Sequence, residues 1–174
     1  IGPLQMPTVR ERVGPAAVDA STMGRPTYDT AVCDLLQGAL CGLERVDRVG
    51  PDRRANVHLA VVLTKCDVLY EAGLLDEEWK SEKLRHDGVF DTEVHQRLSE
   101  MIGARLVEWE PAAFNLIRHR FPNHGFFGVS ATGGLPDSGG DGWVGVNPWR
   151  VEEPVLWAGW MLGMIEGAAR PLAR

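Results

Sequence analysis

The stretch Val57-His58-Leu59-Ala60-Val61-Val62-Leu63-Thr64-Lys65-Cys66-Asp67 decides the fold class. Residues 57–63 form a short, nearly continuous apolar run that is rich in β-branched side chains. Such a run is typical of a strand that is buried on both faces of a parallel sheet. Polar residues follow it directly, and parallel α/β sheets bind ligands beyond the carboxyl ends of their strands. We therefore expect a central strand over residues 57–63, followed by a functional loop.

A second strand with polar residues at its end is predicted further along the chain. Gly125-Phe126-Phe127-Gly128-Val129-Ser130 is a short apolar run, and Ser130-Ala131-Thr132 closes it. Helical patterns lie before, between and after the two strands. This alternation predicts an α/β protein with a three-layer architecture, in which helices flank a parallel sheet.

Three segments have the period of an amphipathic helix. The first covers residues 28–49, and the second begins at Asp91 and should be kinked or split by Pro111. The last runs over residues 152–165, where acidic residues and a proline favour a helix N-terminus. Over residues 68–90, the sequence predicts only a short helix, followed by an irregular, charged segment.

The remaining segments predict loops around one domain. Residues 1–27 contain several glycines and prolines without a sustained period, so we expect a loop or a partly disordered lead-in. Residues 28–174 are then a single domain, which fits a chain of 174 residues. Within it, residues 133–147 are rich in glycine and predict a flexible surface insertion.

Composition narrows the classes of partner and compartment. A net charge of -6 disfavours broad binding to nucleic acid or anionic lipid. The apolar stretch at residues 154–165 is too short to span a membrane. The chain has an odd number of cysteines, Cys33, Cys41 and Cys66, which fits a reducing compartment better than a set of disulfides. We therefore expect a cytoplasmic protein, in which the three cysteines are small buried hydrophobic residues.

Metal and hydrolase chemistry find little support in the sequence. The five histidines lack metal-ligand spacing, so they are expected on the surface or packed inside, and no metal site is assigned. Ser130 and His124 could be cast as part of a hydrolase triad, but no GxSxG elbow surrounds Ser130. No catalytic residue is assigned. The tryptophans near the C-terminus could form a sugar or base platform, but we interpret them as packing residues.

The two strand ends resemble a known pair of motifs. Thr64-Lys65-Cys66-Asp67 and Ser130-Ala131-Thr132 are similar to the [NT]KxD and SA[KLT] guanine-recognition motifs of P-loop GTPases. Alone, TKxD could be a solvated turn; the second motif favours the functional interpretation. The resemblance covers roughly residues 28–168, and Arg150-Val151-Glu152-Glu153-Pro154 with Leu156-Trp157 resembles the closing helix of bacterial double-GTPase-type proteins. It implies a P-loop NTPase-like fold that binds GTP or GDP.

The resemblance also implies a role for each motif residue. Asp67 would accept hydrogen bonds from the guanine ring N–H and exocyclic amine, and so select guanine over adenine. Lys65 would lay its aliphatic stem along the base. The backbone N–H of Ala131 would face the guanine 6-oxo group, within the loop that Ser130 and Thr132 complete. Thr64 replaces the commoner asparagine and keeps a hydroxyl group but loses the amide.

The phosphate-binding motif of the same family is missing. No GxxxxGK[ST] occurs, so the residues that would hold the β and γ phosphates and Mg²⁺ are absent. We therefore expect the chain to be the C-terminal part of a regulatory GTPase domain, incomplete at its N-terminus and unable to hydrolyse GTP alone. The alternative is a degenerate GTPase fold that acts as a protein interaction module. Its partner could be another protein or a second GTPase-like domain.

Overall fold

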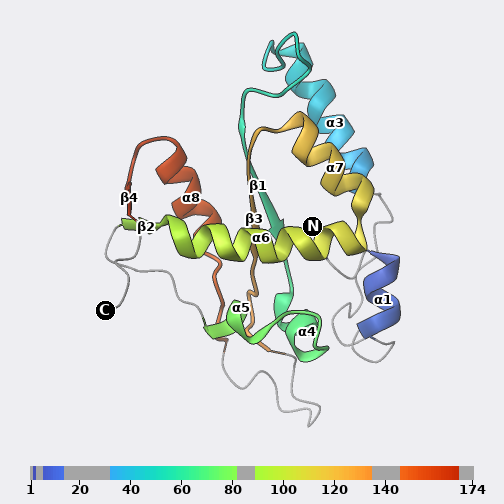
Figure 1. Cartoon of the computed structure of the whole chain (residues 1–174), viewed down its shortest axis with the longest axis vertical. Coiled ribbons are helices and arrows are strands. Elements are labelled where there is room, and N and C mark those ends of the chain that lie inside the picture. The colour runs from blue at the N-terminus through green and yellow to red at the C-terminus, as the bar shows by residue number, and fades with distance from the viewer. Residues whose placement is uncertain (1, 3–5, 14–31, 82–88, 135–145, 169–174) are drawn as a thin grey trace.

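The computed structural model describes residues 2, 6–13, 32–81, 89–134 and 146–168. In this part of the chain, helices flank two separate pairs of short parallel strands (Figure 1). In chain order the elements are α1 (Pro7–Val13), α3 (Val32–Arg45), β1 (His58–Leu63), α4 (Cys66–Glu71), α5 (Glu77–Ser81), β2 (Val89–Asp91), α6 (Thr92–Trp109), α7 (Pro111–Arg120), β3 (Asn123–Gly128), α8 (Glu153–Met161) and β4 (Glu166–Ala168).

The two predicted strands exist and pair with each other. β1 lies parallel to β3, with His58 opposite Asn123 and Leu63 opposite Gly128. The chain between them passes through α4, α5, β2, α6 and α7. Because the strands are parallel, their carboxyl ends meet at one edge of the sheet, toward α4 and α5 (Figure 1). The two loops that the sequence predicts after these strands therefore lie at the same edge.

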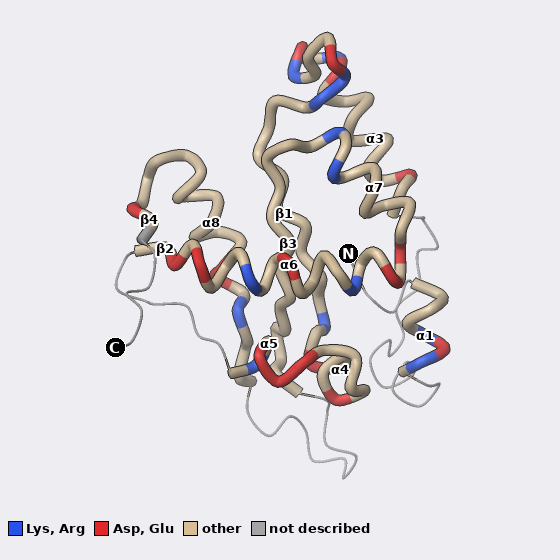
Figure 2. The backbone as a smooth tube through the Cα atoms, viewed as in Figure 1, with Lys and Arg blue, Asp and Glu red and all other residues tan. Residues whose placement is uncertain are grey.

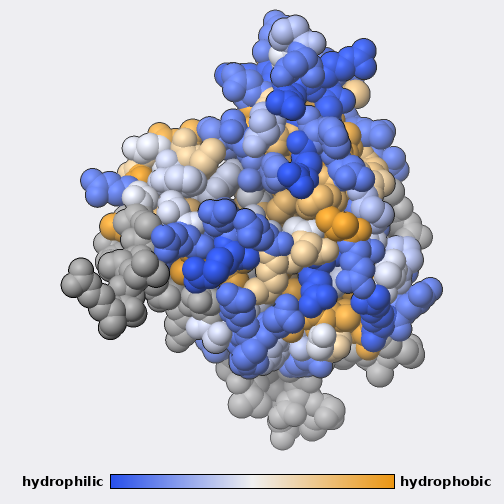
Figure 3. Space-filling model, viewed as in Figure 1, coloured by the Kyte–Doolittle hydropathy of each residue, from blue (hydrophilic) through white to orange (hydrophobic). Residues whose placement is uncertain are grey.

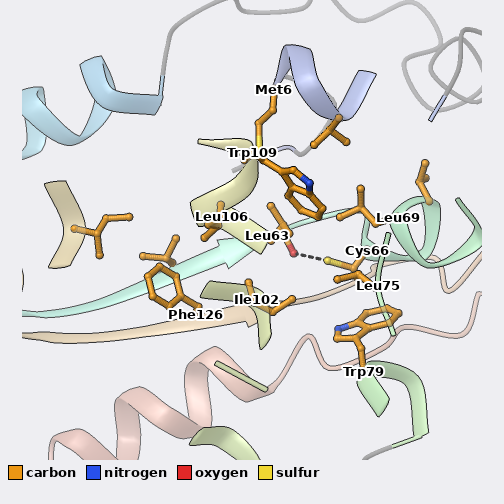
Figure 4. Packing of buried hydrophobic residues seen from close by; sticks show 14 residues of the cluster. Met6, Leu63, Cys66, Leu69, Leu75, Trp79, Ile102, Leu106, Trp109 and Phe126 are labelled. Carbon is orange, nitrogen blue, oxygen red and sulfur yellow. Dashed lines mark hydrogen bonds between the residues drawn. The ribbon is translucent and has the colours of Figure 1, made fainter. Parts of the chain in front are cut away.

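Side chains of β1 pack into two different apolar clusters, as the alternation along a strand requires. Val61 and Leu63 belong to a cluster that includes residues of α1, α4, α5, α6 and α7 (Figure 4). Ala60 and Val62 face a second cluster around Phe127 and Trp157. The prediction of a strand buried on both faces is therefore confirmed for the face of Val61 and Leu63, whereas Ala60 and Val62 on the other face are half-buried.

The long helical pattern is split where proline predicts it. Asp91 precedes α6, and its carboxylate accepts a hydrogen bond from the Val94 backbone N–H at 3.0 Å. Helix α6 ends at Trp109, and α7 starts at Pro111. Proline fits this first position, because its missing N–H would have no partner within the helix there.

The predicted lead-in over residues 1–27 is wrong in part. Residues Pro7–Val13 form helix α1, and residues 14–27 lie outside the described ranges. Met6 and Val9 have no exposed surface and pack into the same cluster as Trp109 (Figure 4). Packing against α6, which is distant in the sequence, stabilises this short helix. The spacing of apolar residues within residues 1–27 alone could not reveal that contact.

The predicted end of the last helix is also wrong. Helix α8 ends at Met161, and β4 follows and pairs in parallel with β2. Gly163 has a φ of 70°, which lies in the left-handed region that glycine adopts without strain. Its N–H donates to Trp160 O at 2.9 Å, and the Met164 N–H donates to Gly159 O at 2.8 Å. This pair of bonds is a Schellman motif, which ends a helix.

Two of the three cysteines are not buried as predicted. Cys33 and Cys41 both lie on α3, but Cys33 is half-buried and Cys41 is exposed, whereas Cys66 is buried. Helix α3 packs through Val32 and Leu40 instead. Cys33 and Cys41 each follow one of these residues by one position, which turns them off the packed face.

The structure shows the predicted α/β class, with helices and parallel strands, but the described residues do not show the three-layer arrangement. Within the described ranges the strands form two parallel pairs and no larger sheet. Most of the glycine-rich segment, residues 135–145, lies outside those ranges, so its predicted flexibility concerns residues that are not described. In the described part of the chain, no helix combines the length and apolar character that crossing a membrane requires.

The stability of this core should depend on pH through His95. Its ring stacks on Phe127 at 4.9 Å between centroids and lies 5.3 Å from Phe90. Burial lowers the pKa of His95 to about 4 from 6.5, and the charge of Arg150 adds to the shift. Between these two values the unfolded chain binds more protons, so the free energy of unfolding falls as the pH drops, by about 2 kcal/mol from pH 7 to pH 4.5.

Urea unfolding at pH 7 and pH 4.5 measures this loss. His95→Phe removes the titrating ring and should flatten the pH dependence, whereas the same experiment on His119→Gln serves as the control. His119 is exposed, so its replacement should leave the slope as it is. An unchanged slope in His95→Phe would contradict the prediction.

Candidate functional site

The structure brings the two predicted loops together. The Val129 N–H donates to Leu63 O at 2.8 Å, and the Cys66 N–H donates to Val129 O at 3.0 Å. These bonds continue the pairing of β1 and β3 beyond the strands. At the loops themselves, Thr132 Oγ1 donates to Asp67 Oδ2 at 3.4 Å. Residues that are far apart in the sequence thus form one site.

A sharp turn at Lys65 leads from β1 into α4. Its φ of 56° and ψ of 37° lie in the left-handed region, which is uncommon for a residue with a Cβ atom. The turn places Asp67 in the first turn of α4 with 3% of its surface exposed. Thr64 is exposed and Lys65 is half-buried at the same edge.

Asp67 is the only carboxylate of the two motifs, and it is incompletely satisfied. Among the atoms that the structure describes, its buried Oδ1 has no hydrogen-bond partner, and Oδ2 has only the long contact with Thr132. A buried polar atom without a partner is costly and uncommon, so such an atom calls for an explanation. A ligand with adjacent N–H donors would satisfy both oxygens.

The second loop is held by Ser130, whose surface is fully buried. Its Oγ accepts a hydrogen bond from the Gly133 N–H at 2.8 Å. Its backbone exchanges two hydrogen bonds with Trp149, at 2.9 and 2.7 Å. Ala131 is exposed and Thr132 is half-buried. Ser130 thus fixes the loop, and its two neighbours carry the accessible surface.

A segment that sequence reasoning did not assign to the site covers this loop. Residues 147–150 run antiparallel to residues 130–133, because the Asn147 N–H donates to Thr132 O at 3.1 Å in addition to the Ser130 and Trp149 pair. The approach is close at Gly133, where an added Cβ atom would lie 1.9 Å from Asn147 O. We call residues 147–150 the covering segment. Of its residues, only Arg150, as the start of the predicted closing helix, and Trp149, as one of the packing tryptophans, stand out in the sequence.

Aromatic residues connect the covering segment to α4 and α5. The Trp79 indole N–H donates to Gly128 O at 3.0 Å, and its ring lies 5.4 Å from the Trp149 ring. Lys80 Nζ lies 4.7 Å from the Tyr70 ring centroid and 4.8 Å from that of Trp149, within cation–π range. Figure 2 shows several acidic residues in α4 and α5. The two loops therefore rest on a packed base.

The side-chain groups that the two loops bring together are hydrogen-bonding groups, namely the Asp67 carboxylate and the Ser130 and Thr132 hydroxyls. Among the described residues, no group of three His, Cys, Asp or Glu residues could hold a metal ion. The one cysteine at the site, Cys66, is buried, and this burial raises the pKa of its thiol.

Comparison with protein-family models, with curated proteins and with solved structures finds no match to this chain.

Proposed function

We propose that this chain is the guanine-nucleotide-binding portion of a regulatory P-loop GTPase. Asp67 carries the proposal, because its buried carboxylate lies at the carboxyl end of β1 with an oxygen that has no partner in the described part of the chain. Guanine offers two adjacent N–H donors, one on the ring and one on the exocyclic amine. These donors match the two oxygens of one carboxylate.

Adenine lacks this pair of donors, so it would leave the carboxylate unsatisfied. Leaving a buried charged acceptor without a partner costs roughly several kcal/mol. A difference of this size is enough for strong selection of guanine over adenine. Lys65 would support the base with its aliphatic stem, and the exposed Ala131 would present its backbone N–H to the 6-oxo group. Thr64 and Thr132 complete the two loops, and Ser130 fixes the second one.

The proposal concerns base recognition and not phosphate chemistry. The sequence contains no GxxxxGK[ST], the motif that would hold the phosphates and Mg²⁺. The parallel pairing of β1 and β3 and the flanking helices support a P-loop-like, three-layer domain, of which this chain would supply the guanine-recognising part. GTP hydrolysis then requires phosphate-binding residues that this chain does not contain.

Calorimetric titration with GDP and ADP tests the proposal. We expect GDP to bind at least about tenfold more tightly than ADP, since the phosphates are identical and only the base differs. Guanosine without phosphates should retain the preference over adenosine, because the discriminating contacts are to the base. Equal affinity for GDP and ADP would contradict guanine recognition.

A protein interaction module is the second candidate, and exposed apolar residues favour it. Val155, Leu162 and Met164, in and after α8, have 72%, 66% and 76% of their surface exposed. Polar residues cover most of the face drawn in Figure 3, with apolar areas between them. Absence of guanine preference together with specific capture of a protein partner that Leu162→Glu abolishes would support this second function.

A further inference from the structure

Arg150 has a buried side chain that joins separate parts of the site. Its Nη1 donates to Trp79 O at 3.1 Å, and its Nη2 lies 2.6 Å from Glu153 Oε1. Trp79 belongs to α5 and Glu153 to α8. The guanidinium thus connects the covering segment to two helices that pack on the core.

These contacts complete a ring around the end of β3. The indole of Trp79 donates to Gly128 O, the last residue of the strand. Trp149, the residue before Arg150, exchanges two backbone hydrogen bonds with Ser130. The path from Gly128 through Trp79, Arg150 and Trp149 therefore returns to the loop that follows β3.

The backbone of Arg150 indicates that this side chain is needed. Its φ of 61° lies in the left-handed region, where a Cβ atom is unfavourable and glycine fits without strain. The buried pair with Glu153 also loses its hydration, and burial raises the pKa of Glu153 to about 7 although Arg150 opposes the shift. Backbone strain and loss of hydration both cost free energy at Arg150. We therefore expect its side-chain contacts to stabilise the structure enough to offset these two costs.

We propose that Arg150 is a positioning residue for the second recognition loop. Its guanidinium holds the covering segment in place, and the covering segment fixes Ala131 and Thr132 relative to Asp67. Two paired segments alone would be marginally stable in water, so the anchor at Arg150 decides whether their hydrogen bonds persist. The effect on nucleotide rests on the proposed function, whereas the effect on the loop does not.

Amide hydrogen exchange followed by NMR tests the anchor directly. In Arg150→Gly, we expect exchange at the Ser130 and Trp149 amides to accelerate about tenfold or more, while the Val129 amide, which bonds to Leu63 O, keeps its rate. Glycine also relieves the backbone strain at this position. If the side chain had no role, the same substitution would leave exchange unchanged or slow it, and the proposal would be wrong.

Arg53→Gly is the matched control. Arg53 has a φ of 60° like Arg150, but its side chain is exposed and lies away from the covering segment in the loop before β1. Its replacement should leave the exchange rates of Ser130 and Trp149 unchanged. Arg150→Lys retains the charge but lacks the two guanidinium nitrogens that contact Trp79 O and Glu153. The Ser130 and Trp149 amides should therefore keep only part of their protection from exchange.

Further variants separate positioning from general stability. Glu153→Gln preserves shape and an acceptor, and should accelerate the same two amides by a smaller factor. Equal acceleration of Val129 in Arg150→Gly would assign Arg150 to global stability and overturn the proposal. With GDP as probe, Arg150→Gly should weaken binding about tenfold and Arg53→Gly should not. If the unmodified protein shows no preference for GDP over ADP, the proposed function fails, while the exchange rates still decide the role of Arg150.

Discussion

Asp67→Asn is expected to shift nucleotide preference from guanosine toward xanthosine nucleotides. The amide replaces one acceptor with a donor, which opposes the guanine amine, so GDP binding should weaken by roughly 2–4 kcal/mol. Xanthine has an oxygen where guanine has its amine, and the new amide can donate to it. Competition between GDP and XDP, measured by calorimetry, should therefore change in favour of XDP.

Asp47→Asn provides the control for this substitution. It removes the same charge, but Asp47 is exposed and its φ of 53° suits asparagine as well as aspartate. Its affinities for GDP and XDP should match those of the unmodified protein. If Asp67→Asn leaves the ratio of GDP to XDP affinity unchanged, Asp67 does not contact the base and the TKCD sequence is only a turn.

The parts of the site that the sequence predicted are those set by local chemistry. An apolar β-branched run identifies β1, and polar residues after two strands identify the two loops. Asp91 and Pro111 determine helix boundaries through a side-chain cap and a missing N–H, which a reader of the sequence can recognise. Gly163 is a similar local signal, because glycine at the position after a helix C-cap is typical of a helix end.

The parts that were missed depend on contacts between distant residues. Strands β2 and β4 have three residues each, too few to show an alternating pattern. Trp79 reaches Gly128 across 49 positions, and Arg150 reaches Trp79 across 71. The charged segment around Trp79 looks irregular in the sequence, because Trp79, the buried residue of α5, contacts residues that are distant along the chain.

Gly128→Ala should cause a large loss of stability, because the last residue of β3 has no room for a side chain. An added Cβ atom would lie 2.8 Å from Trp79 Nε1, 2.9 Å from Ile102 Cδ1 and 3.1 Å from Cys66 Sγ. The end of Ile102 can rotate, but the indole is held by its own bond to Gly128 O. Overpacking of this kind should lower the free energy of unfolding by about 3 kcal/mol.

Urea denaturation of Gly128→Ala and Gly42→Ala checks this prediction through a contrast in sign. Gly42 lies on α3, and an added Cβ atom there meets nothing within 4 Å. Alanine should therefore stabilise the helix by up to about 1 kcal/mol through its higher helix propensity. The same methyl group thus raises stability at one glycine and lowers it at the other. A loss below about 1 kcal/mol in Gly128→Ala would mean that Trp79 and β3 can separate without cost, and the ring of contacts through Arg150 would then be too loose to position the recognition loop.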